Sequence, residues 1–308
     1  MKSFEKKIAS SAFRNKSNLI FYIVAVALPV LQFLIFYIGV NFNSITLAFK
    51  HYNADGTYSV VWFENIVQVI KDFGNMPTLQ YALRNSFSAY FASLLIGTTL
   101  ALLFSYYIFK KFPLSKTFRV FLFLPQIISA VVMVLLYSYM VSEFLPEVAN
   151  KLFHIEMKGL LDDPKTRFGT LVFYYLWVGF GTSTLLYSGA MNNISESIME
   201  AAKIDGAGFF VEFFRIVFPL IFPTFVTFIV AGLASLFSAQ LELYSFYADA
   251  AEFEVYTVGY YMYVETLKAT TARYPYLSAM GMTITLIVAP IALVVRWLLE
   301  KFGPSVER

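Results

Sequence analysis

Side chains able to perform acid–base, metal or nucleotide chemistry are scarce in this sequence of 308 residues. Cysteine is absent, which excludes disulfides and thiolate ligands, and the only two histidines, His51 and His154, lie far apart. The sequence also lacks the G-x-x-x-x-G-K-[ST] motif, so it predicts no P-loop that binds ATP. We therefore predict a protein with no catalytic residue, no cofactor and no metal site.

One polar segment, residues 192–208, has a pattern suited to binding another protein. Ser197 and Glu200 are spaced as a capping box, which predicts the start of a helix, and Gly206 is placed to end it. The apolar positions between them fall on one helical face: Ile198, Ala201 and Ala202. A helix of about two turns could dock into a partner's cleft or lie on a membrane surface, and these residues alone leave both open.

The elements around this segment follow from the composition, which is 58% hydrophobic and only 14% charged, with a mean hydropathy of +0.65. Soluble domains carry roughly a quarter charged residues, so much of this chain must face lipid. About 20 apolar residues cross the hydrocarbon core, and six windows reach that length: 19–40, 87–109, 120–141, 168–190, 216–238 and 277–297. The fold class is therefore all-α, a polytopic membrane protein with about six transmembrane helices.

The middles of these windows contain no Asp, Glu, Lys, Arg or His. Transporters driven by ion gradients usually keep such groups at depth, so energy for transport would have to come from another polypeptide. Glu242 and Arg296 lie near window ends, where snorkelling accounts for them. Three prolines inside windows predict kinks, because neighbouring helices can satisfy the freed carbonyls: Pro29, Pro125 and Pro290.

Lysine and arginine are concentrated in two segments that should share the cytoplasmic side. The N-terminal arm carries Lys2, Lys6, Lys7, Arg14 and Lys16. The loop after the second window carries Lys110, Lys111, Lys116 and Arg119. The predicted order is a cytoplasmic arm (1–17), a first transmembrane helix (18–40), an external segment (41–82), a core of five transmembrane helices (83–301) and a cytoplasmic tail (302–308). A short interfacial helix is predicted within residues 255–268.

The segment at 192–208 resembles the EAA loop of ATP-binding-cassette importer permeases, whose pattern is E-A-A, three residues, G, nine residues, I, one residue, L-P. Every spacing fits, with Phe218 in place of leucine as the one departure: Glu200-Ala201-Ala202, Gly206, Ile216 and Phe218-Pro219. The run Ile204-Asp205-Gly206-Ala207 is similar to the carbohydrate-uptake branch. Further stretches resemble the entry to the permease core: Arg84-Asn85-Ser86, the end of the second window, Phe118-Arg119 and Leu124-Pro125.

This resemblance to the first permease of maltose and glycerol-phosphate systems implies a set of partners and a site. Two permeases would form a path for sugar in a bacterial cell membrane, with both termini cytoplasmic, over ATPase subunits and beneath an external solute-binding protein. The short helix between the fourth and fifth windows would be a cytoplasmic coupling helix. Its contact with the ATPase would be made by Glu200, Ala201, Ala202, Asp205 and Gly206.

Candidate groups along a substrate path are the aromatic and hydroxyl side chains of the fourth and fifth windows. The fourth offers Tyr174, Tyr175, Trp177, Thr182, Ser183 and Thr184, and the end of the fifth offers Ser235, Ser238, Gln240 and Tyr244. Helix packing is the commoner role of such hydroxyls, as it is of Gly181 and other small residues. We select four residues for the path: Trp177, Ser238, Gln240 and Tyr244.

Three other functions stay open. The chain could serve an importer of a non-sugar solute, or it could be a non-transport membrane assembly protein whose loop lies on lipid. A membrane enzyme such as a glycosyltransferase would need acids near the membrane surface, where only Asp162 and Asp163 form a pair. Of these the enzyme is the least favoured, because an exposed acidic loop explains that pair.

Overall fold

The computed structural model describes residues 16–304, so the arm predicted at 1–17 and the tail predicted at 302–308 lie mostly outside the described residues. Six helices in the described part are long and apolar enough to cross a membrane. They cover Ile20–Ala48, Pro77–Phe109, Ala130–Phe153, Pro164–Asn192, Phe209–Ala234 and Thr271–Phe302. The predicted fold class, an all-α protein with six membrane-spanning helices, is confirmed.

The chain divides into two compact units, and the smaller comprises the described residues up to Val69 together with Ala269–Thr283. Its elements include a short antiparallel hairpin whose register pairs Lys50 with Val60. Asn65 supports the hairpin by donating its side-chain amide to the carbonyls of Ala48 (3.0 Å) and Lys50 (2.7 Å). The elements up to this point are α2 (Lys16–Gln32), η1 (Phe33–Gly39), α3 (Val40–Ala48), β1 (Lys50–Tyr52), β2 (Tyr58–Val60) and the start of α4 (Glu64–Asn75).

The larger unit comprises Ile70–Lys268 and Ile284 onward. Its first half contains α5 (Pro77–Ala92), η2 (Ser93–Gly97), α6 (Thr98–Phe109), α7 (Ser115–Ile127), α8 (Ala130–Tyr139), η3 (Met140–Phe144), α9 (Leu145–Phe153) and α10 (Pro164–Asn192). Its second half contains α11 (Glu196–Ile204), α12 (Phe209–Glu212), η4 (Phe213–Val217), α13 (Phe218–Ala234), α14 (Leu243–Tyr247), η5 (Phe253–Val255) and α15 (Val258–Lys268). After η6 (Thr271–Arg273), the last helix is α16 (Tyr274–Phe302), which belongs partly to each unit.

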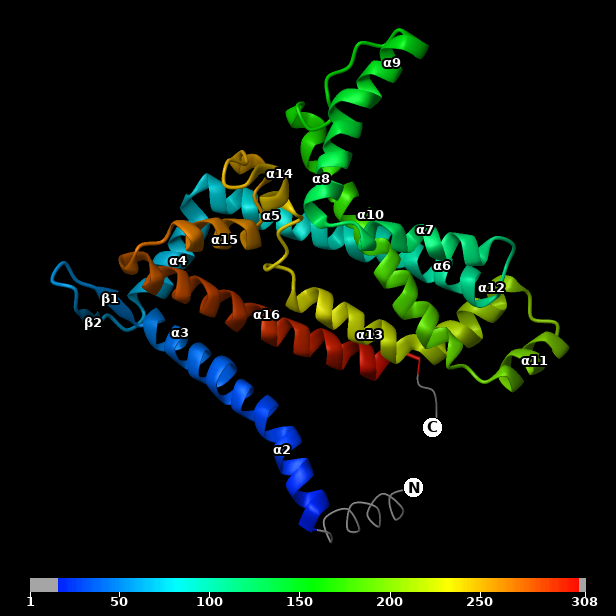
Figure 1. Cartoon of the computed structure of the whole chain (residues 1–308), viewed down its shortest axis with the longest axis horizontal. Helices are drawn as coiled ribbons and strands as arrows, with labels where there is room; N and C mark the ends of the chain where they lie inside the picture. The colour runs from blue at the N-terminus through cyan, green and yellow to red at the C-terminus, as the bar shows by residue number, and fades with distance from the viewer. Residues whose placement is uncertain (1–15, 305–308) are drawn as a thin grey trace. The chain divides into compact units, whose positions relative to one another are not determined.

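The third predicted window, 120–141, is wrong, because that stretch is two helices rather than one span. Ile128 and Ser129 have extended backbone angles (ψ 141° and 144°) and separate α7 from α8, where the chain changes direction sharply (Figure 1). Pro125 lies inside α7, and Gln126 donates its side-chain amide to the Val178 carbonyl of α10 at 3.0 Å. Contacts with α10 therefore hold α7 alongside it, and the third long helix begins only at Ala130.

The helices of the larger unit pack closely at small residues, as predicted for Gly181. A Cβ atom built on this glycine of α10 would collide with the backbone carbonyl of Leu122 in α7. The helices beside it enclose buried cores, one around Tyr137, Leu171 and Tyr174 and another around Tyr106, Tyr187 and Ile221. The short helix predicted at 255–268 is α15, which begins at Val258 and buries much of one face.

We expect Gly181→Ala to destabilise the protein while Gly189→Ala, in the same helix, stabilises it slightly. The added methyl group at position 181 meets backbone and must push α7 and α10 apart, an overpacking cost of about 1–3 kcal/mol. A Cβ at Gly189 meets no atom within 4 Å, so alanine there gains up to about 1 kcal/mol of helix propensity. Thermal unfolding of the purified protein in detergent measures both effects. Equal melting temperatures for Gly181→Ala and Gly189→Ala would contradict the close α7–α10 contact.

Candidate functional site

The polar segment between the fourth and fifth long helices forms α11, which lies beyond the ends of α10 and α12 (Figure 1). Gly206 follows its end with φ +73°, a left-handed conformation that glycine adopts without strain. The N–H of Gly206 donates to the Lys203 carbonyl (3.2 Å), and that of Ala207 donates to the Ala202 carbonyl (3.0 Å). These two bonds form a Schellman ending, so the prediction that Gly206 ends this helix is confirmed.

The predicted start of α11 is wrong by two residues. The N-cap is Ser195, which has extended backbone angles, and Ser197 lies inside the first turn. The hydroxyls of these two serines are hydrogen-bonded to each other at 2.7 Å instead of capping backbone N–H groups. α10 ends in a turn in which the Ile194 N–H donates to the Met191 carbonyl. Because Ser195 directly follows this turn, α11 begins two residues before the predicted cap.

The residues predicted to couple to an ATPase fall on two sides of α11. Ala202 is only 4% exposed, so its side chain faces this chain. Ile204, in the last turn, is 86% exposed, an apolar side chain of the kind that a protein partner covers. Ile204 was not in the predicted set, and the four members of that set besides Ala202 are all exposed: Glu200, Ala201, Asp205 and Gly206.

A buried carboxylate ties the segment after α11 to the end of α6. The side chain of Glu212 in α12 is 6% exposed, and its Oε1 accepts hydrogen bonds from Lys110 Nζ (2.8 Å) and from the Tyr106 hydroxyl (2.6 Å). Lys110 Nζ also lies 3.0 Å from Oε2. The Tyr106 ring packs against the rings of Phe209 and Phe213, with centroids 4.9 and 5.0 Å away. We call Tyr106, Lys110 and Glu212 the α6–α12 clamp.

The α6–α12 clamp was not among the features predicted from the sequence. Lys110 was assigned only to the basic loop, and Glu212 falls in an amphipathic stretch about a hundred residues later. The one available signal was local, namely a single carboxylate among the phenylalanines at 209, 210, 213 and 214. A charged group placed among apolar residues and buried is expected to be paired, but the sequence does not say with which residue.

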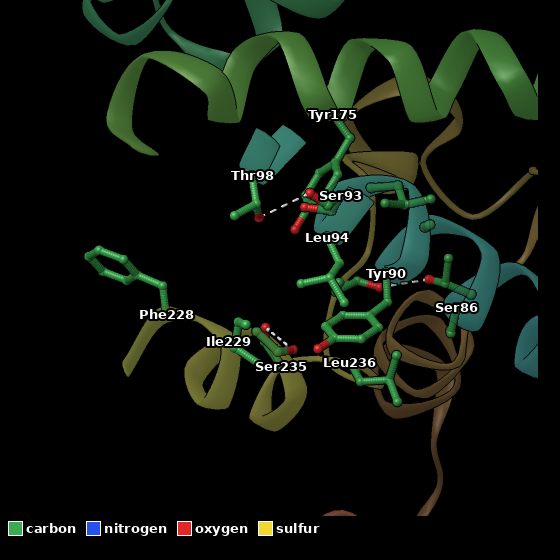
Figure 2. Close-up of a pocket in the computed structure, with 15 residues that line it drawn as sticks. Ser86, Tyr90, Ser93, Leu94, Thr98, Tyr175, Phe228, Ile229, Ser235 and Leu236 are labelled. Atoms are coloured by element: carbon green, nitrogen blue, oxygen red, sulfur yellow. Dashed lines mark hydrogen bonds between the residues drawn. The ribbon is translucent and has the colours of Figure 1, made fainter. Parts of the chain in front are cut away.

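A hollow lined by hydroxyl and aromatic groups lies between α5, η2, α6, α10 and α13. It consists of two adjoining cavities of about 90 and 230 Å³, which share Ser93, Thr98 and Tyr175. In Figure 2, Tyr175 points from α10 toward Ser93 and Thr98, and Tyr90 lies across the cavity beside Leu236. Aromatic rings with a few hydroxyl groups around them are typical of small-molecule sites.

The larger cavity also contains a carboxylate, that of Glu242, together with Tyr174 and Ser183. Glu242 has a left-handed backbone (φ +58°), and its Oε2 accepts a hydrogen bond from Ser245 at 3.0 Å. Glu242 was predicted to snorkel toward the membrane surface, whereas the structure places it at the hollow. Within residues 16–304, no three His, Asp or Glu side chains are grouped so that they could hold a metal ion.

The four residues selected for the substrate path lie beside the hollow rather than among its lining residues. Trp177 is 39% exposed, and its ring lies 6.2 Å from that of Tyr137. Tyr244 packs edge-on against Tyr263, with centroids 4.9 Å apart. Ser238 donates to the backbone carbonyl of Ser235 at 3.2 Å. Gln240 is half-buried, and four residues from the wider set do line the hollow: Tyr174, Tyr175, Ser183 and Ser235.

One wall of the hollow is fastened to the segment before α15 by polar side chains of α5. Asn85 donates its side-chain amide to the backbone carbonyls of Glu254 (2.7 Å) and Tyr256 (2.9 Å). Ser86 Oγ accepts a hydrogen bond from the N–H of Val258 at 3.0 Å. The Arg84-Asn85-Ser86 stretch of the sequence therefore positions α5, which carries Ser86 and Tyr90 into the hollow.

Curated relatives include transport permeases from several bacteria. The chain is 25% identical over 209 residues to the maltose/maltodextrin transport system permease protein MalF of Photorhabdus laumondii, matching 62% of this chain and 40% of the relative. It is 22% identical over 270 residues to the arabinooligosaccharides transport system permease protein AraP of Bacillus subtilis, with 86% and 84% covered. The chain thus spans less than half of the MalF relative's length.

A solved structure contains a chain of similar fold. A chain of a bacterial alginate ABC transporter, solved in complex with an alginate pentasaccharide-bound periplasmic protein, superposes with a TM-score of 0.76 at 18% sequence identity. The likeness covers 93% of this chain and 96% of that one. Residues 93–308 match the family model described as binding-protein-dependent transport system inner membrane component. This chain therefore belongs to the family of inner membrane components of binding-protein-dependent transport systems.

Proposed function

We propose that this chain is one of two permease subunits of an ATP-driven importer for a sugar or oligosaccharide. A second permease completes the path, cytoplasmic ATPase subunits supply the energy, and an external solute-binding protein delivers the substrate. The family membership supports the permease role. The lysine- and arginine-rich loop after α6 contacts α12 through the pair of Lys110 and Glu212. Because lysine and arginine are concentrated in cytoplasmic segments of membrane proteins, we propose that this loop, α12 and both termini are cytoplasmic.

The observation that carries this proposal is the geometry of α11. This nine-residue helix lies outside the long helices. The left-handed Gly206 ends it, and the buried Ala202 packs against the rest of the chain. Its outer surface presents Glu200, Ala201 and Ile204, a small apolar patch with a charge beside it. ATP-driven closure of the ATPases would push this surface, and the α6–α12 clamp would pass the displacement to α6.

Two observations favour a neutral sugar as the substrate. The named relatives are permeases for maltose, maltodextrin and arabinooligosaccharides. The described lining of the hollow offers tyrosine rings, serine and threonine hydroxyls and the Glu242 carboxylate, with no lysine or arginine among them. Such groups accept and donate hydrogen bonds to sugar hydroxyls, whereas a phosphorylated or acidic sugar would meet a like charge. We also include in the proposed substrate path the four residues that lie beside the hollow: Trp177, Ser238, Gln240 and Tyr244.

Cysteine crosslinking tests the coupling surface. The chain has no cysteine of its own, so Ala201→Cys introduces a single thiol on the outer side of α11. We expect a short bifunctional reagent to join it to a copurifying ATPase subunit, and the product to be identified by peptide mass spectrometry.

Glu200→Ala should lower ATP hydrolysis by the assembled complex by about tenfold, because a charged contact at a protein interface is worth roughly 1.5–3 kcal/mol.

Ala202→Cys is the matched control, because the side chain of Ala202, next to Ala201 in sequence, is buried within this chain. It should give no intermolecular product under the same conditions. Crosslinks from Ala201→Cys that reach only lipid or this chain itself would contradict the proposed coupling and favour an assembly protein whose loop lies on the membrane. Full ATP hydrolysis in Glu200→Ala would remove that residue from the contact.

A further inference from the structure

The loop between α6 and α7 carries a groove that neither the hollow nor the coupling surface uses. Its volume is about 530 Å³, and its lining combines apolar and cationic side chains. The residues that matter here are Ile108, Phe112, Leu114, Lys111, Lys116 and Arg119. The groove lies beside α12, because the rings of Phe112 and Phe209 are 6.0 Å apart, so it opens at the same membrane face as α11.

Among the described residues, the three cations that line this groove have no acidic partner. Lys110, next in sequence, is engaged by Glu212, but Lys111, Lys116 and Arg119 are exposed and form no ion pair within residues 16–304. The chain has no Asp or Glu anywhere between Asp72 and Glu143. Three positive charges therefore line one groove with no acid nearby in the sequence, and their mutual repulsion favours an external anion.

The start of α7 adds further groups that suit an anion. The first turn of this 13-residue helix contains no acidic residue, although acids are favoured there by the helix dipole. Ser115 and Thr117 also line the groove and offer hydroxyl donors. Backbone N–H groups and cations together at a helix start form a ready site for phosphate groups.

The surface next to these charges is apolar. Leu114 is 68% exposed, and Val120 and Phe121 in α7 are 67% and 65% exposed. A soluble anion would gain nothing from this apolar strip, whereas acyl chains would cover it. The site also lies where α6 ends and α7 begins, the level at which phospholipid headgroups meet the ends of membrane helices.

We propose that this groove, at Lys111, Lys116 and Arg119, binds the phosphate headgroup of an anionic phospholipid whose acyl chains lie against Leu114, Val120 and Phe121. The lipid would neutralise the basic loop and pack beside the α6–α12 clamp. This site is independent of the sugar path and of the ATPase contact.

The test is native mass spectrometry of the full chain in detergent, titrated with phosphatidylglycerol or with phosphatidylcholine of the same acyl chains. We expect phosphatidylglycerol to bind at least tenfold more tightly. A triple variant, Lys111→Gln/Lys116→Gln/Arg119→Gln, should lose this preference, since each cation near a membrane surface contributes about fivefold. The matched control is Lys71→Gln/Lys158→Gln/Lys165→Gln, which removes the same charge from exposed lysines elsewhere and should keep the preference.

Several results would overturn the proposal. Equal binding of the two lipids, or equal loss in both triple variants, would show only general charge attraction. Displacement of the lipid by millimolar inorganic phosphate would indicate a site for a free anion. If the groove variant bound lipid normally but lost a partner subunit, the occupant would be a protein. A charge-preserving variant, Lys111→Arg/Lys116→Arg/Arg119→Lys, should retain binding and guards against misfolding.

Discussion

Lys110→Met is expected to be among the most destabilising single substitutions in this chain, lowering the free energy of unfolding by about 3 kcal/mol. Removing one partner of a buried pair leaves an uncompensated charge, which typically costs 3–5 kcal/mol. The lower end applies because the Lys110 side chain is 32% exposed, whereas Glu212 is only 6% exposed. Thermal or SDS-induced unfolding in detergent measures the change.

The double variant Lys110→Met/Glu212→Leu should recover most of that loss, because apolar residues of similar volume often replace a buried ion pair without net cost. Lys151→Met provides the control. It breaks an exposed pair, Lys151 Nζ to Glu147 Oε1 at 2.6 Å, and should change stability by about 0.5 kcal/mol at most. Equal effects of Lys110→Met and Lys151→Met would show that the clamp contributes no more than a surface contact.

Gly206→Pro is expected to abolish substrate uptake by the assembled transporter while leaving the long helices intact. Proline requires φ near −65°, but Gly206 has φ +73° and donates its N–H to Lys203. The end of α11 must then unwind at a cost of about 3 kcal/mol, which misplaces Ala201 and Glu200. Reconstituted vesicles containing ATP and the solute-binding protein measure uptake, and a melting curve checks the fold.

Two other substitutions sharpen this result. Gly208→Pro lies in the same loop, but Gly208 already has φ −73°, so we expect uptake to stay within about twofold of wild type. Gly206→Asn should keep much of the activity, because asparagine tolerates the left-handed conformation. Normal uptake by Gly206→Pro would mean that the shape of α11 does not matter for coupling.

Local patterns were enough to predict most elements of this fold. Hydropathy located five of the six long helices, and the glycine at position 206 located the end of α11. The start of α11 was less well determined, because Ser195 and Ser197 are both good caps and the turn after α10 decides between them. The break at Ile128–Ser129 has no hydropathy signal, since residues on both sides are apolar.

Features that join distant segments could not be predicted from the sequence. Trp177 was one of the four residues selected for the substrate path, but Tyr175 is the residue that lines the hollow. Two positions correspond to about 200° around a helix, so these side chains point to nearly opposite sides of α10. The α6–α12 clamp joins residues 102 positions apart, and no periodicity within either helix indicates such a pair.

The hydrogen bonds from α5 to residues 254–258 have a consequence for folding during synthesis of the protein. Asn85 and Ser86 bond to partners 169 to 172 positions later in the chain. At synthesis rates of about 5–20 residues per second, those partners emerge from the ribosome roughly 10–30 s after α5. Throughout that interval the amide of Asn85 lacks its native acceptors, and this wall of the hollow can close only near the end of translation.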